Sequence, residues 1–370
     1  MDFLPSEEQI TIRELAATIL ADRATNERVA EIAATADAFD RELWRALADA
    51  NLLGLVVPDA YGGSGFGLLD LCLLLEEQGR TVAPVPLLPT LALGVLPIAR
   101  FGSDRQHAEL LPRVVTGDAV LTAGLVEYGS DDPLVPSTTA TADGDAWRLD
   151  GTKAFVPVAD LAERIVVVAA GADGPGLFLV DPVHATLGRE ITTTGEAIWD
   201  VQLDGAPAEA LAAPGAAGAD AVKWAVQVAT VATCALQVGL SEAAVRMTAT
   251  YTSSRKQFER PIATFQAVQQ RIADSYIDVQ NMRVTMLSAA WRITNDRPAD
   301  DAVTIAKFWA ADGGHRVAAA TQHLHGGVGV DLAYPLHRYT RWSKQLELTL
   351  GSAQPQLAAL GARIAAQYGA

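Results

Sequence analysis

The sequence contains few of the residues from which disulfide frameworks and metal centres are built. Its 370 residues include two cysteines and six histidines. Cys72 and Cys234 lie far apart inside apolar segments, so we interpret them as two buried thiols in a reducing compartment. His323 and His325 stand beside glycines, but no third ligand follows at a spacing that a metal would need. The sequence therefore predicts neither a disulfide nor a metal site.

Clusters of basic residues are also missing. There are 28 Lys and Arg against 44 Asp and Glu, a formal net charge of −16, which repels nucleic acid and anionic lipid. A small anionic ligand remains compatible with this charge, because a local pocket of Arg and backbone N–H groups can act against the global field. The first residues lack the basic and apolar regions of a signal peptide, and LLDLCLLLEEQG is too short to span a bilayer. We therefore predict a cytoplasmic protein with no nucleic-acid or membrane partner.

What the sequence does contain is a change of pattern along the chain. Half of the residues are apolar and 19% are charged, which allows two or three hydrophobic cores. Residues 1–117 follow helical periodicity, whereas residues 118–212 contain short β-type runs and a hairpin pattern around Asp143 and Gly144. After a linker rich in Gly, Ala and Pro, residues 218–370 return to helical patterns, the longest at 221–253, 264–295 and 300–325. Helices of this length are expected to pack side by side in a bundle.

Three stretches within this order are specific. The first is SRKQFERPIATFQAVQQRIAD, which starts at Ser254 and joins two of the long helices. Taken alone, it is a charged helix end with a hydrophobic staple. The second, QHLHGGVGVDLAYPLHRYTR, starts at Gln322, and its glycines alone could simply end a helix. The third is LDGTKAFVPVAD, which starts at Leu149 in the β-type region.

Together, these stretches resemble the acyl-CoA dehydrogenase family over essentially the whole chain. The family carries R-x-x-F-G-x-P-I followed by F-Q, then Q-x-x-G-G-x-G, and L-x-G-x-K-x-W-I-T-N in its β domain. The resemblance implies an α+β, acyl-CoA dehydrogenase-like fold. It has an N-terminal helical domain (1–117), a middle β-barrel or sandwich domain (118–212) and a C-terminal four-helix bundle (218–370). It also implies FAD bound between subunits, an acyl-CoA substrate and an electron-transfer flavoprotein as acceptor.

The resemblance further implies which residues hold the cofactor. The two C-terminal stretches would bind the adenosine diphosphate end of a flavin whose ring lies in the neighbouring subunit. Arg255 would contact the pyrophosphate, Gln322 would contact the adenosine end, and three glycines would let the backbone approach closely. Two phenylalanines would form apolar walls, although both could equally be bundle core. The complete predicted set is Arg255, Gln257, Phe258, Phe265, Gln322, Gly326, Gly327 and Gly329.

The side of the site that would hold the flavin ring departs from the family. Pro157 stands where a Ser or Thr would hydrogen-bond the reactive flavin nitrogen, and proline offers neither a hydroxyl nor an N–H. The family loop T-E-P-x-x-G-S-D becomes LVEYGSD, which matches from Glu127 to Asp131 only if two residues are deleted and Tyr128 replaces the proline. We therefore predict that this subunit does not hold a working flavin ring on its own β domain.

The catalytic base is missing at both positions that the family uses. The reaction needs a carboxylate that takes the α-proton of the acyl thioester. Leu350 occupies the position of the glutamate in Y-E-G-T/S, and Ala229 occupies the alternative position on the preceding long helix. Glu347 lies three residues before Leu350, about one helical turn away, and we interpret it as part of a solvated face. No residue of this chain is therefore predicted to be catalytic.

These observations predict a subunit that serves a neighbour. The chain resembles the non-catalytic partner subunit of actinobacterial heterotetrameric acyl-CoA dehydrogenases that act on steroid side chains. Its partner would then be a catalytic subunit, and the complex would dehydrogenate the CoA thioester of a sterol side chain. Two alternatives stay open: a self-sufficient homotetrameric acyl-CoA dehydrogenase with a relocated base, and a non-enzymatic acyl-CoA-binding protein.

Overall fold

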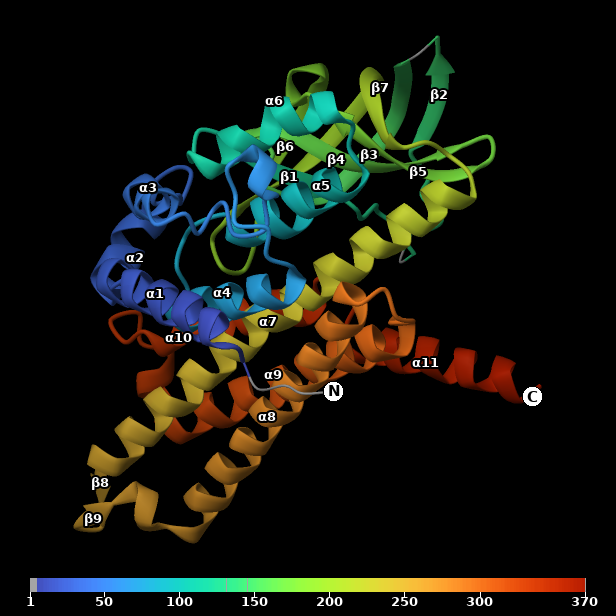
Figure 1. Ribbon diagram of the computed structural model, residues 1–370. Helices are drawn as coiled ribbons and strands as arrows, with labels where there is room; N and C mark the ends of the chain where they lie inside the picture. Colours follow the sequence, from blue (N-terminus) through green and yellow to red (C-terminus); the bar gives the residue numbers. More distant parts are fainter. Residues whose placement is uncertain (1–4, 131, 145, 370) are drawn as a thin grey trace. The chain divides into compact units, whose positions relative to one another are not determined.

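The computed structural model describes residues 5–130, 132–144 and 146–369 (Figure 1). The chain divides into two compact units, each made from separated parts of the sequence. One contains Met1–Ala30, Cys72–Ala83 and Thr230–Ala370, and the other contains Glu31–Leu71 and Pro84–Ala229. The predicted fold class is confirmed, since helical regions precede and follow a sheet in the sequence. The boundaries of the three predicted domains stay a prediction.

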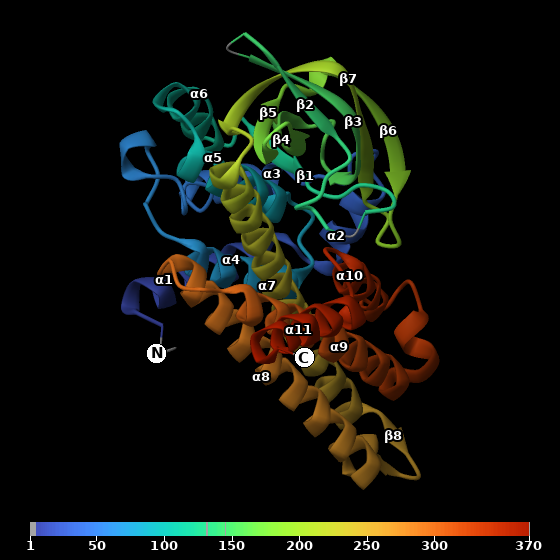
Figure 2. The same cartoon turned by 90° about the vertical axis from the view of Figure 1, so that its right-hand side faces the viewer.

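The sheet in the second of these units has seven strands, which curve around a common core in Figure 2. β1 lies parallel to β4, and one parallel bridge joins β2 to β4. The pairs β2–β3, β3–β7, β4–β5, β5–β7 and β6–β7 are antiparallel. Because β4, β2, β3, β7 and β5 pair in a closed ring, these five strands form a barrel. The strands are β1 (Val120–Gly124), β2 (Thr139–Asp143), β3 (Ala146–Pro157), β4 (Ala162–Gly171), β5 (Gly174–Val180), β6 (Ala185–Ile191) and β7 (Ala197–Ala212).

The barrel is filled by apolar side chains that alternate along its strands. Val156, Phe178 and Val201 are among the residues of this core. The predicted hairpin is confirmed, because β2 and β3 are antiparallel with Asp143 opposite Ala146. The short helices that lie within this unit are α3 (Arg41–Asp49), η1 (Asp59–Tyr61), η2 (Leu88–Val95), α5 (Leu96–Phe101), α6 (Asp104–Val115) and η3 (Pro182–His184).

Long helices dominate the other unit. The three long helical patterns predicted from the sequence are confirmed as α7, α8 and α9, and α8 lies side by side with α9 (Figure 1). Two later helices, α10 and α11, also pack on α9. Three helices, α2, α4 and α7, have residues in both units. The elements not yet given are α1 (Glu7–Arg23), α2 (Asn26–Ala33), α4 (Leu68–Thr81), α7 (Ala216–Ser254), β8 (Lys256–Gln257), β9 (Arg260–Pro261), η4 (Ile262–Thr264), α8 (Gln266–Thr294), α9 (Asp300–His325), η5 (Gly326–Val330), α10 (Leu336–Leu348) and α11 (Ala353–Tyr368).

α7 is the core helix of the fold. Within the described ranges, it is the one helix long and apolar enough to cross a membrane, and 89% of its most apolar window is buried in the protein. This burial is typical of the central helix of a globular core. Cys234 of α7 and Cys72 of α4 are buried thiols outside any disulfide, as predicted, and burial raises the pKa of the Cys234 thiol to about 12.

Two glycines allow α4 and α7 to approach closely. A Cβ at Gly239 of α7 would lie 1.8 Å from the carbonyl oxygen of Glu76 on α4. A Cβ at Gly79 of α4 would lie 2.2 Å from the carbonyl oxygen of Leu236 on α7. Since neither helix has a side chain at the contact, their backbones touch, and polar side chains nearby are enclosed between helices.

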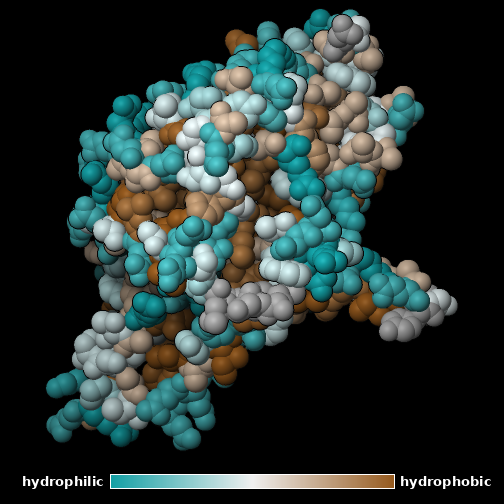
Figure 3. Space-filling view, viewed as in Figure 1, coloured by the Kyte–Doolittle hydropathy of each residue, from teal (hydrophilic) through white to brown (hydrophobic). Residues whose placement is uncertain are grey.

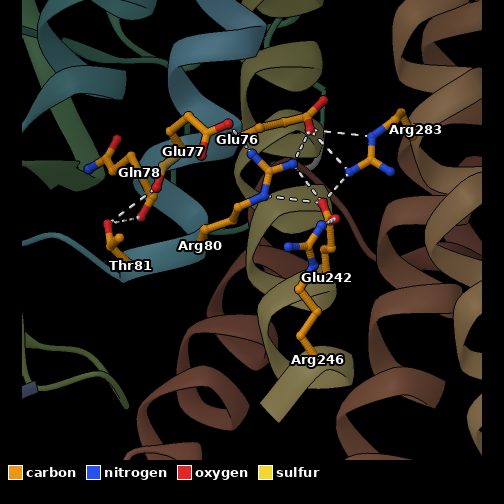
Figure 4. Close-up of polar contacts among 8 residues, drawn as sticks. All are labelled: Glu76, Glu77, Gln78, Arg80, Thr81, Glu242, Arg246 and Arg283. Carbon is orange, nitrogen blue, oxygen red and sulfur yellow. Dashed lines mark hydrogen bonds and ion pairs between the residues drawn. The ribbon is translucent and has the colours of Figure 1, made fainter. Parts of the chain in front are cut away.

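The enclosed side chains form a cluster of charges, drawn in Figure 4. Glu76 is 2% exposed and its carboxylate lies 3.1 Å from both Arg80 of α4 and Arg283 of α8. The carboxylate of Glu242 on α7 lies 2.6 Å from each of the same two guanidinium groups. The two carboxylates thus lie between the two arginines, and three helices meet at one set of ion pairs. We name Glu76, Arg80, Glu242 and Arg283 the buried charge cluster.

The pKa values of the two carboxylates in the buried charge cluster are shifted in opposite directions. Burial raises the pKa of Glu76, against the attraction of Arg283 and Arg80. Burial also opposes the ionisation of Glu242, but the hydrogen bond and charge of Arg80, with Arg283, outweigh it and lower the pKa of Glu242 to about 2. The hydroxyl of Tyr339 on α10 donates to the carbonyl oxygen of Arg80 at 2.8 Å. α10 is therefore tied to the same point.

We expect Arg80→Met to lower the free energy of unfolding by about 3–5 kcal/mol, because it removes one of the two cations that the buried carboxylates of Glu76 and Glu242 share and leaves Arg283 to neutralise both. A matched control is Arg246→Met. Arg246 also pairs with Glu242, but its side chain is 75% exposed, so its removal should cost less than about 1 kcal/mol. Urea unfolding followed by circular dichroism measures both. Similar small losses in the two variants would contradict the role assigned to the buried charge cluster.

Candidate functional site

The first half of the predicted cofactor site is a hairpin that follows α7. The backbone N–H of Arg255 donates to the carbonyl oxygen of Tyr251 at 2.8 Å, so Arg255 continues the last turn of the helix. β8 and β9 then pair around Phe258 and Glu259, whose φ angles are 53° and 64°. Two successive positive φ angles normally require Gly or Asn, so this turn is held against the preference of its residues. Such strain is often found at functional sites.

The hairpin exposes its predicted site residues. Phe258 is 87% exposed, and its ring meets the edge of Phe265 at a centroid distance of 6.3 Å. The guanidinium of Arg260 lies 4.2 Å from the centre of the Phe265 ring. Arg255 and Gln257 are also exposed. Phe258 therefore is not bundle core, and the two rings form an apolar edge beside cationic side chains.

The second half is the glycine loop, which we define as Gly326 to Gly329. Gly326 follows the last residue of α9 with φ 61° and ψ −138°, a conformation that only glycine adopts readily. The Nε2 of Gln322 donates to the carbonyl oxygen of Gly326 at 3.1 Å. A Cβ at Gly329 would lie 2.7 Å from the same Nε2, so the side chain of Gln322 fits against the loop because Gly329 has none. Gln322 therefore shapes the loop from within.

The structure brings the hairpin and the glycine loop together through two aromatic rings. Tyr251, one turn before Arg255, stacks on His325 with ring centroids 4.4 Å apart. His325 directly precedes Gly326. Arg255 and the glycine loop are therefore neighbours at one end of the helical unit. In Figure 3 the tip that carries β8 and β9 is mainly hydrophilic, with hydrophobic atoms beside it.

The residues present fit the diphosphate end of FAD. Within the part of the chain that the structure describes, no carboxylate pairs with the side chain of Arg255, which is exposed. No described atom lies within 4 Å of the Cβ that Gly327 would carry, and its backbone φ is not in the left-handed region. The conformation and packing of the loop therefore do not require a glycine at position 327. A ligand that approaches the backbone closely would explain why a glycine stands there. A guanidinium, backbone N–H groups and an amide are suitable donors for a pyrophosphate and an adenosine.

The β-domain side of the predicted site has a different surface. The Oγ1 of Thr122 donates to the carbonyl oxygen of Pro157, the last residue of β3, at 2.7 Å. Before it, the strand bulges at Phe155, which has φ 57° and is half exposed. The ring of Phe155 packs against Tyr128, and the Tyr128 hydroxyl donates to the Asp200 carboxylate at 2.9 Å. The exposed rings of Tyr128 and Phe155 therefore stand on this surface, and Pro157, where the family would offer a hydroxyl, presents a carbonyl oxygen that is already hydrogen-bonded.

Glu127 has a structural role that the sequence did not reveal. Its carboxylate accepts hydrogen bonds from the backbone N–H of Thr138 at 3.0 Å and from the ammonium of the fully buried Lys153. Burial opposes ionisation of Glu127, but the hydrogen bonds from Lys153 and Thr138 outweigh it and lower the pKa to about 2. Glu127 thus anchors the loop inside the barrel. Asp131, which ends the same motif, lies outside the described residues.

The position at which the resemblance predicts the base is a tight turn between α10 and α11. Leu350 has φ 56° and Gly351 has φ 93°, so the chain reverses at these residues. Glu347 does not face solvent, which corrects our prediction of a solvated face: its side chain is 16% exposed and its carboxylate lies 2.5 Å from Lys344 and 3.1 Å from His315. Because Lys344 and His315 engage its carboxylate, Glu347 is poorly suited to replace a base. Ala229 is fully buried in α7.

A buried lysine under this turn was missed by sequence analysis. The ammonium of Lys307 on α9 donates to the last carbonyl oxygens of α10, those of Leu346 at 2.7 Å and Glu347 at 3.1 Å. A cation at a helix C-terminus opposes the negative end of the helix dipole. Burial lowers the pKa of Lys307 to about 8. The sequence does contain an indication of this buried lysine, because Lys307 interrupts an apolar run within a helical pattern.

Comparison with known proteins assigns the chain to a class. The acyl-CoA dehydrogenase N-terminal domain matches residues 6–118, and the acyl-CoA dehydrogenase C-terminal domain matches residues 216–365. The chain therefore belongs to the acyl-CoA dehydrogenase family, as predicted. Members of this family are FAD-binding oxidoreductases that act on a CH–CH bond of acyl-CoA.

Several relatives are similar over their full length. Acyl-CoA dehydrogenase FadE27 of Mycobacterium tuberculosis is 38% identical over 99% of both chains, and FadE28 of the same organism is 32% identical over 98% of this chain and 99% of its own. A chain of a variant of the Tcur3481–Tcur3483 steroid ACAD has a TM-score of 0.93 and 46% identity over 98% of this chain and 99% of its own. A chain of the ChsE4–ChsE5 complex from Mycobacterium tuberculosis has a TM-score of 0.92 and 38% identity over 99% of both chains.

Two substitutions in the glycine loop test which of its glycines the backbone conformation requires. We expect Gly326→Ala to lower the free energy of unfolding by about 1–2 kcal/mol, because an alanine is strained at its φ and ψ. Gly327→Ala should change it by less than about 0.5 kcal/mol, since the added Cβ meets no described atom. Denaturant unfolding of the purified chain measures both variants. Equal losses in the two would show that the loop is built differently.

Proposed function

We propose that this chain is the non-catalytic subunit of a heterotetrameric, FAD-dependent acyl-CoA dehydrogenase that introduces an α,β double bond into the CoA thioester of a steroid side chain. One observation carries the proposal: Arg255 and the glycine loop lie close together, with groups suited to a diphosphate. By the family resemblance, Leu350 and Ala229 would stand at the two positions of the base, and neither side chain can take a proton. The names of the similar proteins, a steroid ACAD and a two-protein complex, support the substrate and the assembly.

The chemistry requires a partner that supplies what this chain lacks. Removal of the α-proton needs an ionisable acceptor within reach of the α-carbon, and neither leucine nor alanine can accept a proton. When bound, the flavin of FAD supplies the acceptor for the β-hydride. The catalytic subunit would provide the base and the surface for the flavin ring. This chain would hold the adenosine diphosphate end across the interface.

Within that assignment each predicted residue has a task. Arg255 would form charge-assisted hydrogen bonds with the pyrophosphate, and the backbone of Gly326 and Gly327 would approach it without a Cβ. Gln322 would hold the loop and offer its amide oxygen to the adenosine end. Gln257, Phe258 and Phe265 would line the exposed edge, and Gly329 would make room for Gln322. An electron-transfer flavoprotein would take the electrons from the complex, and its location would be cytoplasmic.

Isolation of the chain tests the proposal directly. Expressed alone, it should bind little flavin and should not oxidise acyl-CoA with an artificial electron acceptor, because base and ring surface are missing. Co-expressed with a catalytic partner, it should yield a yellow, active complex. Absorbance at the flavin band and a dye-reduction assay measure both properties. A yellow and active assembly of this chain alone would instead support the self-sufficient homotetramer.

Arg255→Ala tests the assignment of the adenosine side. In the co-expressed complex, we expect it to weaken FAD binding by about 10–100-fold, the loss that follows from removing one charge-assisted contact. The matched control is Lys256→Ala, which removes the same charge one residue later. Lys256 begins β8, and successive residues of a strand point to opposite sides, so its side chain faces away from that of Gln257, which belongs to the predicted set, and should matter little. Flavin content after gel filtration measures both. Equal retention of FAD in the two variants would refute the assignment.

A further inference from the structure

His325, whose ring stacks on Tyr251, is buried beside the proposed adenosine site and makes further hydrogen bonds there. It is the last residue of α9, it is 3% exposed, and it directly precedes the glycine loop. Its Nδ1 lies 2.9 Å from the carbonyl oxygen of Thr321 on the same helix. A carbonyl oxygen only accepts, so Nδ1 carries the proton and donates it. The other ring nitrogen, Nε2, must then accept in the neutral ring.

The partner of Nε2 completes this arrangement. The hydroxyl of Tyr334, in the segment that follows η5, lies 3.0 Å from Nε2 and donates to it. The carbonyl oxygen of Tyr334 is in turn 2.8 Å from the Nδ1 of His337 on α10, which fixes the segment. The hydrogen bonds of His325 therefore select one tautomer of the neutral imidazole.

The same ring also reaches α7. Its face stacks on Tyr251 at 4.4 Å with an interplanar angle of 21°. The carbonyl oxygen of Tyr251 accepts the backbone N–H of Arg255. The imidazole of His325 is thus the group that contacts α7, α9 and the segment after η5 at once. Displacement of the ring would move Arg255 relative to the glycine loop.

We propose that His325 is a positioning residue of the adenosine half-site, and that its neutral imidazole sets the distance between Arg255 and the glycine loop. This inference rests on the proposed function, in which that half-site holds the diphosphate of FAD. It adds a regulation of the site, because FAD binding then weakens when the ring is protonated. The effect is not catalytic, since His325 acts through its neighbours and touches no reacting atom.

The direction of the pH effect follows from the surroundings of the ring. The groups that face His325 are the ring of Tyr251 from α7, the hydroxyl of Tyr334 and the carbonyl of Thr321. Burial lowers the pKa of His325 below its ordinary value, although the hydrogen bond to Thr321 opposes this. The neutral form is therefore favoured in the folded protein. FAD binding should be full above about pH 7 and should be lost as the pH falls through the lowered pKa.

Three variants of the co-expressed complex test the inference, with FAD dissociation measured by the fluorescence of released flavin between about pH 5 and pH 8. His325→Phe keeps a stacking ring but cannot be protonated. We expect it to weaken FAD binding by about tenfold at neutral pH and to flatten the pH profile. Tyr334→Phe removes a donor that stabilises the neutral imidazole, so the loss of FAD should begin at a higher pH. The control is His315→Gln, an exposed histidine on the same helix, which should leave the profile unchanged.

Each result decides between distinct outcomes. A purely structural role of His325 would weaken FAD binding equally at every pH and would leave the midpoint unmoved in Tyr334→Phe, which overturns the inference. Wild-type affinity and pH profile in His325→Phe would overturn it as well. If Arg255→Ala strips FAD while these variants do not differ from wild type, only this inference fails. If Arg255→Ala also retains FAD, the proposed function fails first.

Discussion

The buried charge cluster is the constraint on which the helical unit depends. Burying a charge without a partner costs several kcal/mol, so α4, α7 and α8 are stable together only in the register that places Arg80 and Arg283 on both sides of Glu76 and Glu242. The backbone contact at Gly239 leaves little freedom for another register. α7 continues from this point to Arg255, and α8 starts where the hairpin ends. The position of the proposed site is therefore set by charges well inside the protein.

The two sides of the proposed site differ in the chemical groups that they present. At the ends of α7 and α9 a guanidinium, an open glycine backbone and an amide are arranged for an anion. The barrel surface instead carries the rings of Tyr128 and Phe155, and the carbonyl of Pro157 is already hydrogen-bonded. At the turn after α10, Leu350 has no proton to exchange. In the proposed function such a chain completes a neighbour's site, and its own site would need several simultaneous changes to operate.

Much of this structure could be predicted from the sequence, and the missing parts share one cause. Periodicity predicted the long helices and the β hairpin, because these depend on neighbouring residues. The motifs led to Arg255 and the glycine loop, which the structure places near one another, while their role in binding FAD stays a prediction. The buried charge cluster was missed, since EEQGR has the appearance of an exposed helix end and Glu242 lies 162 residues after Arg80. The pairs of Lys153 with Glu127 and of His325 with Tyr251 were missed for the same reason: only the tertiary fold brings them together.

In the proposed function this chain shares a flavin site with an unlike subunit and does not own one. Native mass spectrometry of the complex, purified with its catalytic partner, counts subunits and FAD molecules in one experiment. We expect two copies of each subunit and two molecules of FAD. Four molecules of FAD in a heterotetramer, or a flavin-loaded tetramer of this chain alone, would contradict it.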